Sequence, residues 1–164
     1  MVIYVIRHGE TDWNTKHWLQ GTTDIPLNQN GIEVAEITSE ALKEVPFDVI
    51  FSSPLKRAYQ TAEIMRGERK IPIIVDQRLK EISFGAYEGL CCTGPEYNIP
   101  DPDFPNFFRD PAHYNPPEGG DSIAELCVRG TDFLTWLIDQ PEYQEKTVLV
   151  SGHGALVKAL LSSL

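Results

Sequence analysis

Two apolar runs that each end at a histidine constrain the fold of this chain more than any other feature. The first run covers residues 2–6 and is followed by Arg7, His8 and Gly9. Its residues are β-branched or aromatic without polar alternation, which is typical of a strand buried on both faces of a parallel sheet. In open α/β sheets the ligand crevice lies outside the carboxyl ends of the strands. Arg7 and His8 are therefore expected at a binding site, and Gly9 is expected to let the backbone approach a bound group closely.

A second run of the same kind lies near the other end of the chain. Residues 147–150 are again largely apolar and β-branched, and they lead through Ser151 and Gly152 to His153 and Gly154. A single histidine is more often structural than catalytic, whereas two histidines at matching strand ends favour a shared site. The two runs predict that both histidines lie at one edge of a sheet.

Between these runs the chain alternates helix and strand patterns. Helices are expected over about residues 32–44, 55–65 and 122–139, and shorter strands over residues 47–51 and 72–75. The loop over residues 10–29 is polar and is expected to line the site. This alternation predicts an α/β fold, a three-layer α/β/α sandwich with a mainly parallel central sheet.

Apolar spacing supports the first and the last of these helices. In the first, near-helical spacing is kept by Val34, Ile37, Ala41 and Leu42. In the last, an apolar face is expected from Ile123, Leu126, Val128, Phe133, Leu134, Leu137 and Ile138. Ser122 and Glu125 have the spacing of a capping box at its start.

Five groups of residues, in order along the chain, carry a resemblance to a known family. They are RHGET at residues 7–11 with Trp13, Asn14, Gln20, Gly21, Asp24, Pro26, Leu27 and Gly31; Ser52, Ser53, Pro54 and Leu55 with Arg57, Ala58, Gln60, Thr61 and Ala62; Glu81 and Ile82 with Phe84, Gly85, Glu88 and Gly89; Gly119, Gly120, Asp121 and Ser122; and the segment around His153. In this order they resemble the histidine phosphatase superfamily, which includes the cofactor-dependent phosphoglycerate mutases. The resemblance covers the chain from Val2 to about its C-terminus and implies a phosphoglycerate mutase-like sandwich.

The chemistry of a phosphate monoester assigns a role to each candidate. Transfer needs an in-line nucleophile, cations for the equatorial oxygens and a proton for the leaving oxygen. His8 is expected to attack as a neutral imidazole whose other nitrogen donates to a nearby backbone carbonyl. Arg7 and Arg57 are expected to grip the phosphoryl oxygens. Further expected substrate-binding residues are Asn14, Gln20, Gly21, His153 and Gly154, with His153 also counted as catalytic; no metal ion and no cofactor is expected.

Two of these assignments have a plain alternative. Arg57 lies in the first turn of a predicted helix, where a cation is unfavourable unless it faces a bound anion. The alternative is a solvated surface charge, which the order of the family landmarks disfavours. Glu81 is, by the resemblance, the family's proton donor, and its neighbours Leu79 and Ile82 indicate a partly apolar setting that favours the protonated form. The alternative is an exposed loop carboxylate.

Composition excludes several classes of protein. A net charge of −10 and a pI near 4.8 are unfavourable for binding nucleic acid or an anionic membrane. No run approaches membrane-spanning length and the N-terminus has no signal-peptide pattern, so a cytoplasmic location is expected. The three cysteines match neither a disulfide framework nor a zinc spacing and are expected as free thiols, and His17 and His113 are expected on the surface.

Residues 91–120 differ from the rest of the chain. They hold prolines and aromatic residues and are expected either to pack as a lid or to form a mobile surface loop. Arg109 is the one cation there, beside the acids Glu96, Asp101, Asp103, Asp110 and Glu118. That balance is a poor setting for a second anionic group and favours an apolar or nucleoside-like leaving group.

The sequence therefore predicts a phosphatase that hydrolyses small-molecule phosphate monoesters through a phosphohistidine. A cofactor-dependent phosphoglycerate mutase is the first alternative, and a non-catalytic phosphate-binding module is the second. Retention of His8 and Glu81 counts against the binding module, because a pure binder needs neither group. The oligomeric state stays open.

One domain is expected over residues 1–164. Members of the family usually continue beyond the helix after the second histidine, so the family's C-terminal part is expected to be missing after Leu164. Leu156, Leu160 and Leu161 are then expected to lack cover.

Overall fold

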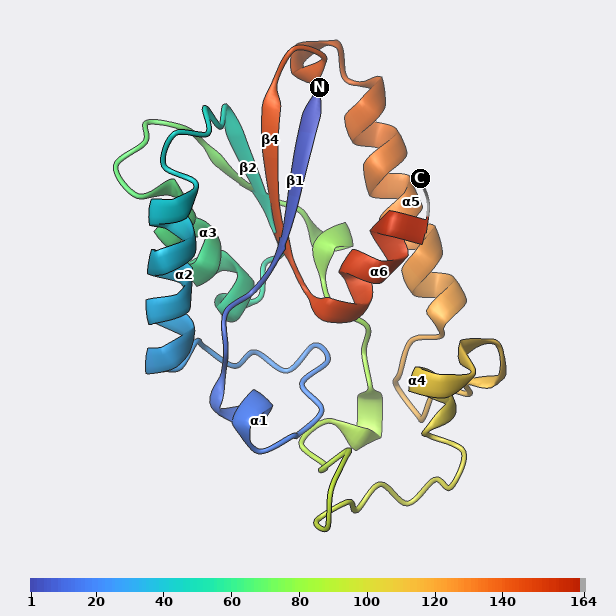
Figure 1. Cartoon of the computed structure of the whole chain (residues 1–164). Helices are drawn as coiled ribbons and strands as arrows, with labels where there is room; N and C mark the ends of the chain where they lie inside the picture. Colours follow the sequence, from blue (N-terminus) through green and yellow to red (C-terminus); the bar gives the residue numbers. More distant parts are fainter. Residues whose placement is uncertain (163–164) are drawn as a thin grey trace.

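The computed structural model describes residues 1–162 of the chain. Within them, four strands form one sheet between two layers of helices (Figure 1). In chain order the strands are β1 (Val2–Arg7), β2 (Val49–Ser52), β3 (Ile73–Val75) and β4 (Thr147–Gly152). They lie in the order β1-β4-β2-β3, and each neighbouring pair is parallel. The predicted α/β class, a three-layer sandwich around a mainly parallel sheet, is confirmed.

Two pairs of helices cover the two faces of the sheet. Helices α2 (Gln29–Ala41) and α3 (Lys56–Arg66) lie on one side in Figure 1, and α5 (Ile123–Asp139) and α6 (Gly154–Ser162) on the other. Short helices α1 (Asp12–Thr15) and α4 (Asn106–Arg109) lie in the long loops. Single 3-10 turns occupy Gln77–Leu79, Gly85–Tyr87, Pro111–His113 and Pro141–Tyr143.

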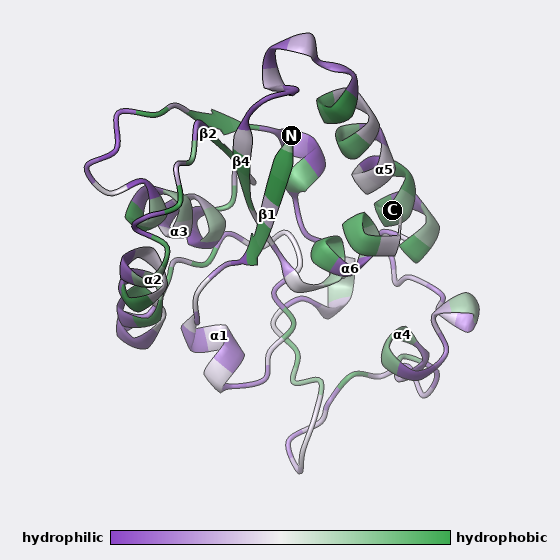
Figure 2. Ribbon diagram, turned by 45° about the horizontal axis from the view of Figure 1, so that its top comes forward, coloured by the Kyte–Doolittle hydropathy of each residue, from purple (hydrophilic) through white to green (hydrophobic). Residues whose placement is uncertain are grey.

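Alternation along the central strands divides the core between these layers. Ile50 and Leu149 pack with Met65 of α3, whereas Phe51 and Val150 pack with the α5 side. Successive side chains of a strand point to opposite faces, so each strand supplies both clusters. Figure 2 colours the ribbon by hydropathy and shows hydrophobic residues concentrated in the strands and in α6.

The prediction that residues 2–6 are buried on both faces is only partly confirmed, because Ile3 and Val5 pack against one core cluster and Tyr4 and Ile6 against the other, without complete burial. Among the described strands β1 pairs only with β4 and forms an edge of the sheet. Val2 is 55% exposed and the residues after it are only partly buried. The absence of polar alternation thus indicated the β-preference of branched side chains rather than complete burial.

Helix α2 begins and ends earlier than its predicted range of residues 32–44. It begins at Gln29 because the Asn28 side chain accepts a hydrogen bond from the Gly31 N–H at 2.8 Å and caps the first turn. The apolar spacing that predicted this helix does not mark its buried face, since Val34 and Ile37 are 48% and 69% exposed. Ala35, between them, faces the core instead.

The other bounds differ only slightly from prediction. Leu55 is the N-cap of α3 and not its first residue, β2 begins at Val49, and β4 continues to Gly152. The capping box of Ser122 and Glu125 at the start of α5 is confirmed. Two residues expected on the apolar face of α5, Val128 and Ile138, are exposed.

Residues 91–120 pack against the core through their aromatic side chains. Phe104 and Tyr114 are buried in the cluster that also holds Phe84 and Leu126. This burial counts against the alternative of a mobile surface loop, although Phe108 stays exposed. Whether the segment acts as a lid stays a prediction.

The predicted lack of cover on α6 is largely wrong. Leu156 and Leu160 are buried against α5 and the sheet, and only Leu161 of the three leucines is exposed. The prediction that family sequence is missing after Leu164 lies outside the described residues, as do Ser163 and Leu164 themselves. None of the helices within residues 1–162 combines the length and apolarity needed to cross a membrane.

Candidate active site

The parallel sheet brings three strand ends together at one edge. His8 follows β1, and its backbone N–H donates to the Gly152 carbonyl at 3.0 Å. His153 follows that glycine at the end of β4. The two imidazole rings lie 5.2 Å apart between centroids. Ser53 follows β2, and its N–H donates to the Ser151 carbonyl at 3.0 Å. The predicted meeting of both histidines at one sheet edge is confirmed.

His8 is held as a neutral imidazole with defined roles for its two nitrogens. Nδ1 lies 2.6 Å from the Gly9 carbonyl oxygen, so it carries the proton and donates. Nε2 accepts a hydrogen bond from Arg57 Nε at 3.2 Å. Burial and the nearby Arg57 charge lower the pKa of His8 to about 3. The nitrogen that faces the arginine therefore keeps its lone pair at neutral pH.

Arg57 is completely buried, so the alternative of a solvated surface charge is wrong. Its Nη1 donates to the Thr23 carbonyl at 2.9 Å and its Nη2 to the Gly21 carbonyl at 2.7 Å. Burial lowers the pKa of Arg57 to about 10, which leaves the guanidinium charged at neutral pH. The two carbonyls hold the guanidinium plane, and its Nε faces His8.

The loop that supplies these carbonyls is held by Glu88, one of the residues that carry the family resemblance but were assigned no role. Its carboxylate accepts hydrogen bonds from the N–H groups of Thr22 and Thr23, each at 2.8 Å. It also accepts from Phe84 N–H at 3.1 Å. Gly21 has φ +50°, and a Cβ there would lie 2.0 Å from Glu88 Oε1. Glycine is thus required at this position by backbone conformation and by space.

Glycine is required at position 9 for a reason other than the one predicted. A Cβ on Gly9 would lie 2.4 Å from the carbonyl oxygen of Gly31, in the first turn of α2. The close approach at Gly9 is therefore between two backbone segments and not toward a bound group. That contact places α2 against the end of β1.

His153 is buried beneath the site and has one partner. Its Nε2 lies 2.8 Å from the Ser53 hydroxyl, and its Nδ1 has no hydrogen-bond partner within residues 1–162. Burial and the charge of Arg57 lower the pKa of His153 well below its ordinary value. The ring is therefore neutral and has one unpaired nitrogen.

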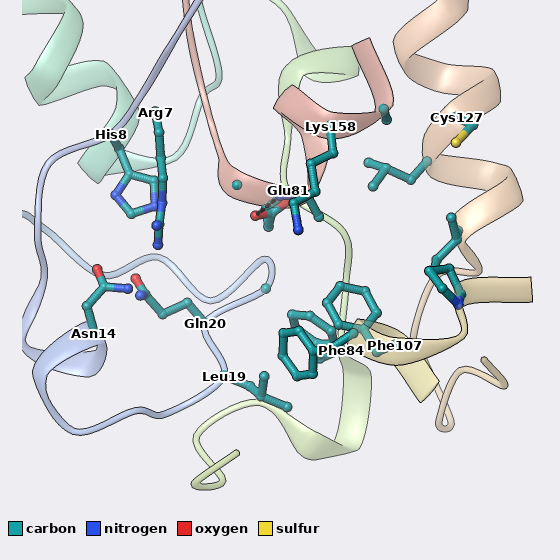
Figure 3. Close-up of a pocket in the computed structure, with 18 of the residues that line it drawn as sticks. Arg7, His8, Asn14, Leu19, Gln20, Glu81, Phe84, Phe107, Cys127 and Lys158 are labelled. Atoms are coloured by element: carbon teal, nitrogen blue, oxygen red, sulfur yellow. Dashed lines mark hydrogen bonds between the residues drawn. The ribbon is translucent and has the colours of Figure 1, made fainter. Parts of the chain in front are cut away.

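Glu81 has the buried apolar neighbours Leu79 and Ile82 that were predicted, and its carboxyl group lies at the N-terminus of α6. Oε1 accepts from the N–H groups of Ile82 and Leu156, and Oε2 accepts from Ala155, at 3.0 to 3.1 Å. The helix N-terminus thus holds the carboxyl group in place. Figure 3 shows the same group directed into the cavity beside Lys158.

Asn14 and Gln20 are oriented through Thr11. The Thr11 N–H donates to Asn14 Oδ1 at 3.0 Å, and the Thr11 hydroxyl donates to Gln20 Oε1 at 2.9 Å. Both amide NH2 groups lack a protein acceptor in the part of the chain described and are available to a ligand. Figure 3 shows the two side chains below His8 and Arg7.

One cavity of about 500 Å³ collects these groups. Of the predicted site residues it is lined by Arg7, His8, Asn14, Gln20, Gly21, Arg57, Glu81 and Gly154, whereas His153 lies behind this surface. Its far side is apolar and is formed by Phe84, Phe107, Phe108, Pro111, Ile123 and Leu126. Lys158 also lines the cavity and was missed. Its position four residues after Gly154, on the same face of α6, could have indicated it.

The arrangement can transfer a phosphoryl group. A neutral imidazole with an available lone pair faces a cavity whose near end carries two guanidinium groups, several N–H donors and one carboxyl group. These are the groups that charge stabilisation and proton transfer at a phosphate ester require. No group of three or more His, Cys, Asp or Glu residues suited to a metal ion occurs within residues 1–162.

Comparison with known proteins points to the same chemistry. The family model of the histidine phosphatase superfamily (branch 1) matches residues 3–164. The chain is 36% identical over 162 residues to the uncharacterized phosphatase PhoE of Bacillus subtilis, covering 99% of this chain and 76% of that protein. It is 31% identical over 168 residues to a 2,3-bisphosphoglycerate-dependent phosphoglycerate mutase of Gloeobacter violaceus, covering 99% and 75%. The solved structure of YhfR from Bacillus stearothermophilus superposes with a TM-score of 0.89 at 35% identity, covering 98% and 78%.

Proposed function

Because this chain belongs to the histidine phosphatase superfamily and is an enzyme that hydrolyses phosphate esters, we propose that it acts through a phosphohistidine formed on His8 Nε2. One observation carries this proposal. His8 Nδ1 donates to the Gly9 carbonyl, so the neutral ring keeps its lone pair on Nε2, beside Arg57. An imidazole held in this tautomer is a nucleophile for phosphorus.

In the first step, Nε2 of His8 attacks phosphorus while the bond from phosphorus to the ester oxygen breaks. Arg57 gives up its hydrogen bond to Nε2 and, with Arg7, neutralises the phosphoryl oxygens. Glu81 gives a proton to the departing alkoxide. In the second step, water attacks the phosphohistidine, Glu81 takes the proton from that water, and inorganic phosphate leaves with His8 restored.

The remaining predicted residues have binding roles in this proposal. The amide NH2 groups of Asn14 and Gln20 donate to phosphoryl oxygens, and His153 donates from behind them. Gly21 supplies a carbonyl that holds Arg57, and Gly154 lines the cavity against the Arg7 side chain. The chain thus supplies every cation and donor that the reaction needs without requiring a metal ion or an organic cofactor.

The substrate class follows from the far side of the cavity. The rings of Phe84, Phe107 and Phe108 favour a small-molecule ester whose leaving group is apolar or aromatic. A cytoplasmic location and a single domain over residues 1–164 are part of the proposal. The location is supported by the free thiols of Cys91, Cys92 and Cys127, which are typical of a reducing compartment.

The mutase alternative has one specific support in Lys158. Mutase substrates carry a carboxylate beside the phosphate, and Lys158 lines the cavity without an ion pair among the described residues. Glycerol 3-phosphate and 3-phosphoglycerate differ chiefly by that carboxylate, so their kcat/KM values in wild type and in Lys158→Gln separate the two substrate classes. A mutase would also transfer phosphate between positions of phosphoglycerate instead of releasing it.

The proposed intermediate is tested by acid and alkaline quenching of turnover with a radiolabelled ester. Label bound to wild-type protein should be lost in acid and kept in alkali, because phosphohistidine is acid-labile. His8→Ala should carry no label, whereas His113→Ala, which changes an exposed histidine, should be labelled normally. Turnover by His8→Ala at the wild-type rate would overturn the proposal. Binding of phosphate by wild type without any turnover would favour the binding module.

A further inference from the structure

The hydroxyl group of Ser53 lies between two partners in the buried layer behind the cavity. Leu55 N–H lies 3.3 Å from Ser53 Oγ, and His153 Nε2 lies 2.8 Å from the same oxygen. Ser53 and His153 are both completely buried. The register of β2 and β4 sets this contact, because the Ser53 N–H donates to the Ser151 carbonyl. The serine at the end of one strand thus meets the histidine at the end of the next.

The number of hydrogens on each group decides which one donates in the hydrogen bond between Ser53 and His153. A serine hydroxyl has one hydrogen to donate and two lone pairs to accept. The Leu55 N–H can only donate, so it occupies one lone pair of Ser53 Oγ. Within the described residues His153 Nε2 is the one acceptor in reach of the Ser53 hydrogen. The hydroxyl therefore donates to Nε2, and the ring proton of neutral His153 lies on Nδ1.

The opposite tautomer leaves more groups unsatisfied. If His153 carried its proton on Nε2 and donated to Ser53, the hydroxyl hydrogen would have no acceptor among the described residues. Nδ1 would then be a lone pair without a partner as well. With the proton on Nδ1, the only unsatisfied group is the Nδ1–H. Buried polar groups without partners are costly, so the tautomer with one such group is favoured.

We propose that Ser53 is a positioning residue that fixes His153 as the Nδ1–H tautomer, so that Nδ1 donates to a phosphoryl oxygen of the substrate. This inference rests on the proposed function. The surroundings of the ring support it, because His153 lies beside His8 and near the charges of Arg57 and Arg7. An acceptor that enters between these groups is anionic. Ligand-free His153 has a donor without an acceptor, and the phosphoryl group supplies one.

The tautomer is measured directly by NMR on protein with isotope-labelled histidine, with the His153 signals assigned by their loss in His153→Gln. Wild type at neutral pH should show a protonated Nδ1 and an unprotonated Nε2. Inorganic phosphate should shift the Nδ1–H signal toward a stronger hydrogen bond and leave the tautomer unchanged. A wild-type ring protonated on Nε2 would overturn the proposal, whatever the variants do.

Variants then test the role of the hydroxyl. Ser53→Ala should lose the single tautomer and lower the rate of phosphohistidine formation by about 10-fold or more, as removal of an outer-shell partner of a catalytic histidine does. Ser53→Thr keeps a hydroxyl and should restore both the tautomer and part of the rate. Ser151→Ala is the matched control, since this buried serine donates to the Ala58 carbonyl and not to a histidine. It should leave the His153 tautomer unchanged.

The outcomes separate this inference from the proposed function. Ser53→Ala with the wild-type tautomer and rate would show that Ser53 does not position His153, while His8 could still be phosphorylated. Absence of any phosphohistidine in wild type would instead remove the reaction itself. If Ser53→Ala lowers the rate and Ser53→Thr with a native fold recovers none of it, the hydroxyl is not the active feature and the proposal fails.

Discussion

His8 combines deep burial with a position between cations, and this has a consequence for stability. Its pKa is about 3 in the folded chain, whereas an imidazole has a value of 6.5 without these surroundings. The unfolded chain therefore binds a proton between about pH 6.5 and about pH 3 that the folded chain does not bind. The free energy of unfolding should fall as the pH falls through that window, and the loss due to His8 should approach about 1.4 kcal/mol per pH unit.

This first prediction is checked by urea unfolding at a series of pH values in wild type and in His8→Asn. The variant should lose stability less steeply than wild type as the pH is lowered, because asparagine does not titrate. His17→Asn is the control, since His17 is exposed and its φ of +56° suits asparagine. Parallel curves for wild type and His8→Asn would show that the imidazole is not held neutral.

The second prediction also concerns a single residue, Glu81. Glu81→Gln keeps one oxygen, which can accept from the N–H groups of Ile82 and Leu156 as Oε1 does, but it loses the acceptor of Ala155 and has no proton to give. Hydrolysis of an alkyl phosphate should slow by about 10²–10⁴-fold, because an alkoxide must be protonated as it leaves. Hydrolysis of p-nitrophenyl phosphate should change far less, since nitrophenolate leaves unaided. The measurement is the ratio of kcat/KM for the two esters, and equal loss on both would remove Glu81 from the acid role.

At the scale of elements, α5 holds the loop that carries Glu81. Arg129 of α5 donates through Nη1 to the carbonyls of Arg78 and Lys80 at 3.0 and 2.5 Å, and through Nη2 to that of Glu81 at 3.3 Å. One guanidinium thus satisfies three carbonyls of the segment that leads from the 3-10 turn Gln77–Leu79 to Glu81. The other end of that segment reaches the α6 N-terminus through the Glu81 carboxyl group. The acid is positioned by two helices of one layer.

The third prediction concerns the hydrogen bonds that Arg129 donates to these three carbonyls. Arg129→Met keeps the side-chain length but removes all the donors, so it should cost about 1–3 kcal/mol of stability for the carbonyls left without partners. Like Glu81→Gln, it should also slow the hydrolysis of alkyl esters more than that of aryl esters. Arg66→Met, the same change on α3 in the opposite helical layer, is the control. A stability loss without any change in the alkyl-to-aryl ratio would show that Arg129 does not position Glu81.

Across the whole molecule, residues 91–120 share the main core and also border the cavity. Phe104 is 1% exposed, and its ring centroid lies 6.0 Å from that of Phe84 and 5.9 Å from that of Tyr87. Phe108, four residues later, is 57% exposed and lines the cavity. The segment therefore joins the substrate side of the site to the hydrophobic core between the sheet and α5.

The fourth prediction separates these two roles. Phe104→Ala should lower the free energy of unfolding by about 3–5 kcal/mol in a single cooperative transition, because it opens a cavity in the main core. Phe108→Ala should change stability by no more than about 0.5 kcal/mol but raise KM for esters with an aromatic leaving group. Denaturant melts and steady-state kinetics of both variants check this. An unchanged melt for Phe104→Ala would mean that the segment is not part of the cooperative unit.

The sequence alone determined the strand–helix order and the chemistry at the strand ends. A run of β-branched residues favours a strand whatever it later packs against, and parallel strands put their carboxyl ends at one edge. The position of His8 and His153 at that edge was therefore predictable from local patterns. The capping box of Ser122 and Glu125 was predictable for the same reason, because both partners lie within one helical turn.

Only the tertiary structure decided which side chains are paired and which are covered. The partner of His8 Nε2 is Arg57, 49 residues away, and the partner of His153 is Ser53, 100 residues away. Burial of β1 depends on strand order in space, and the cover of Leu156 and Leu160 depends on how α6 packs against α5. Local patterns carry the conformational preference of a few neighbouring residues, whereas contacts between distant residues are set by the packing of the complete core.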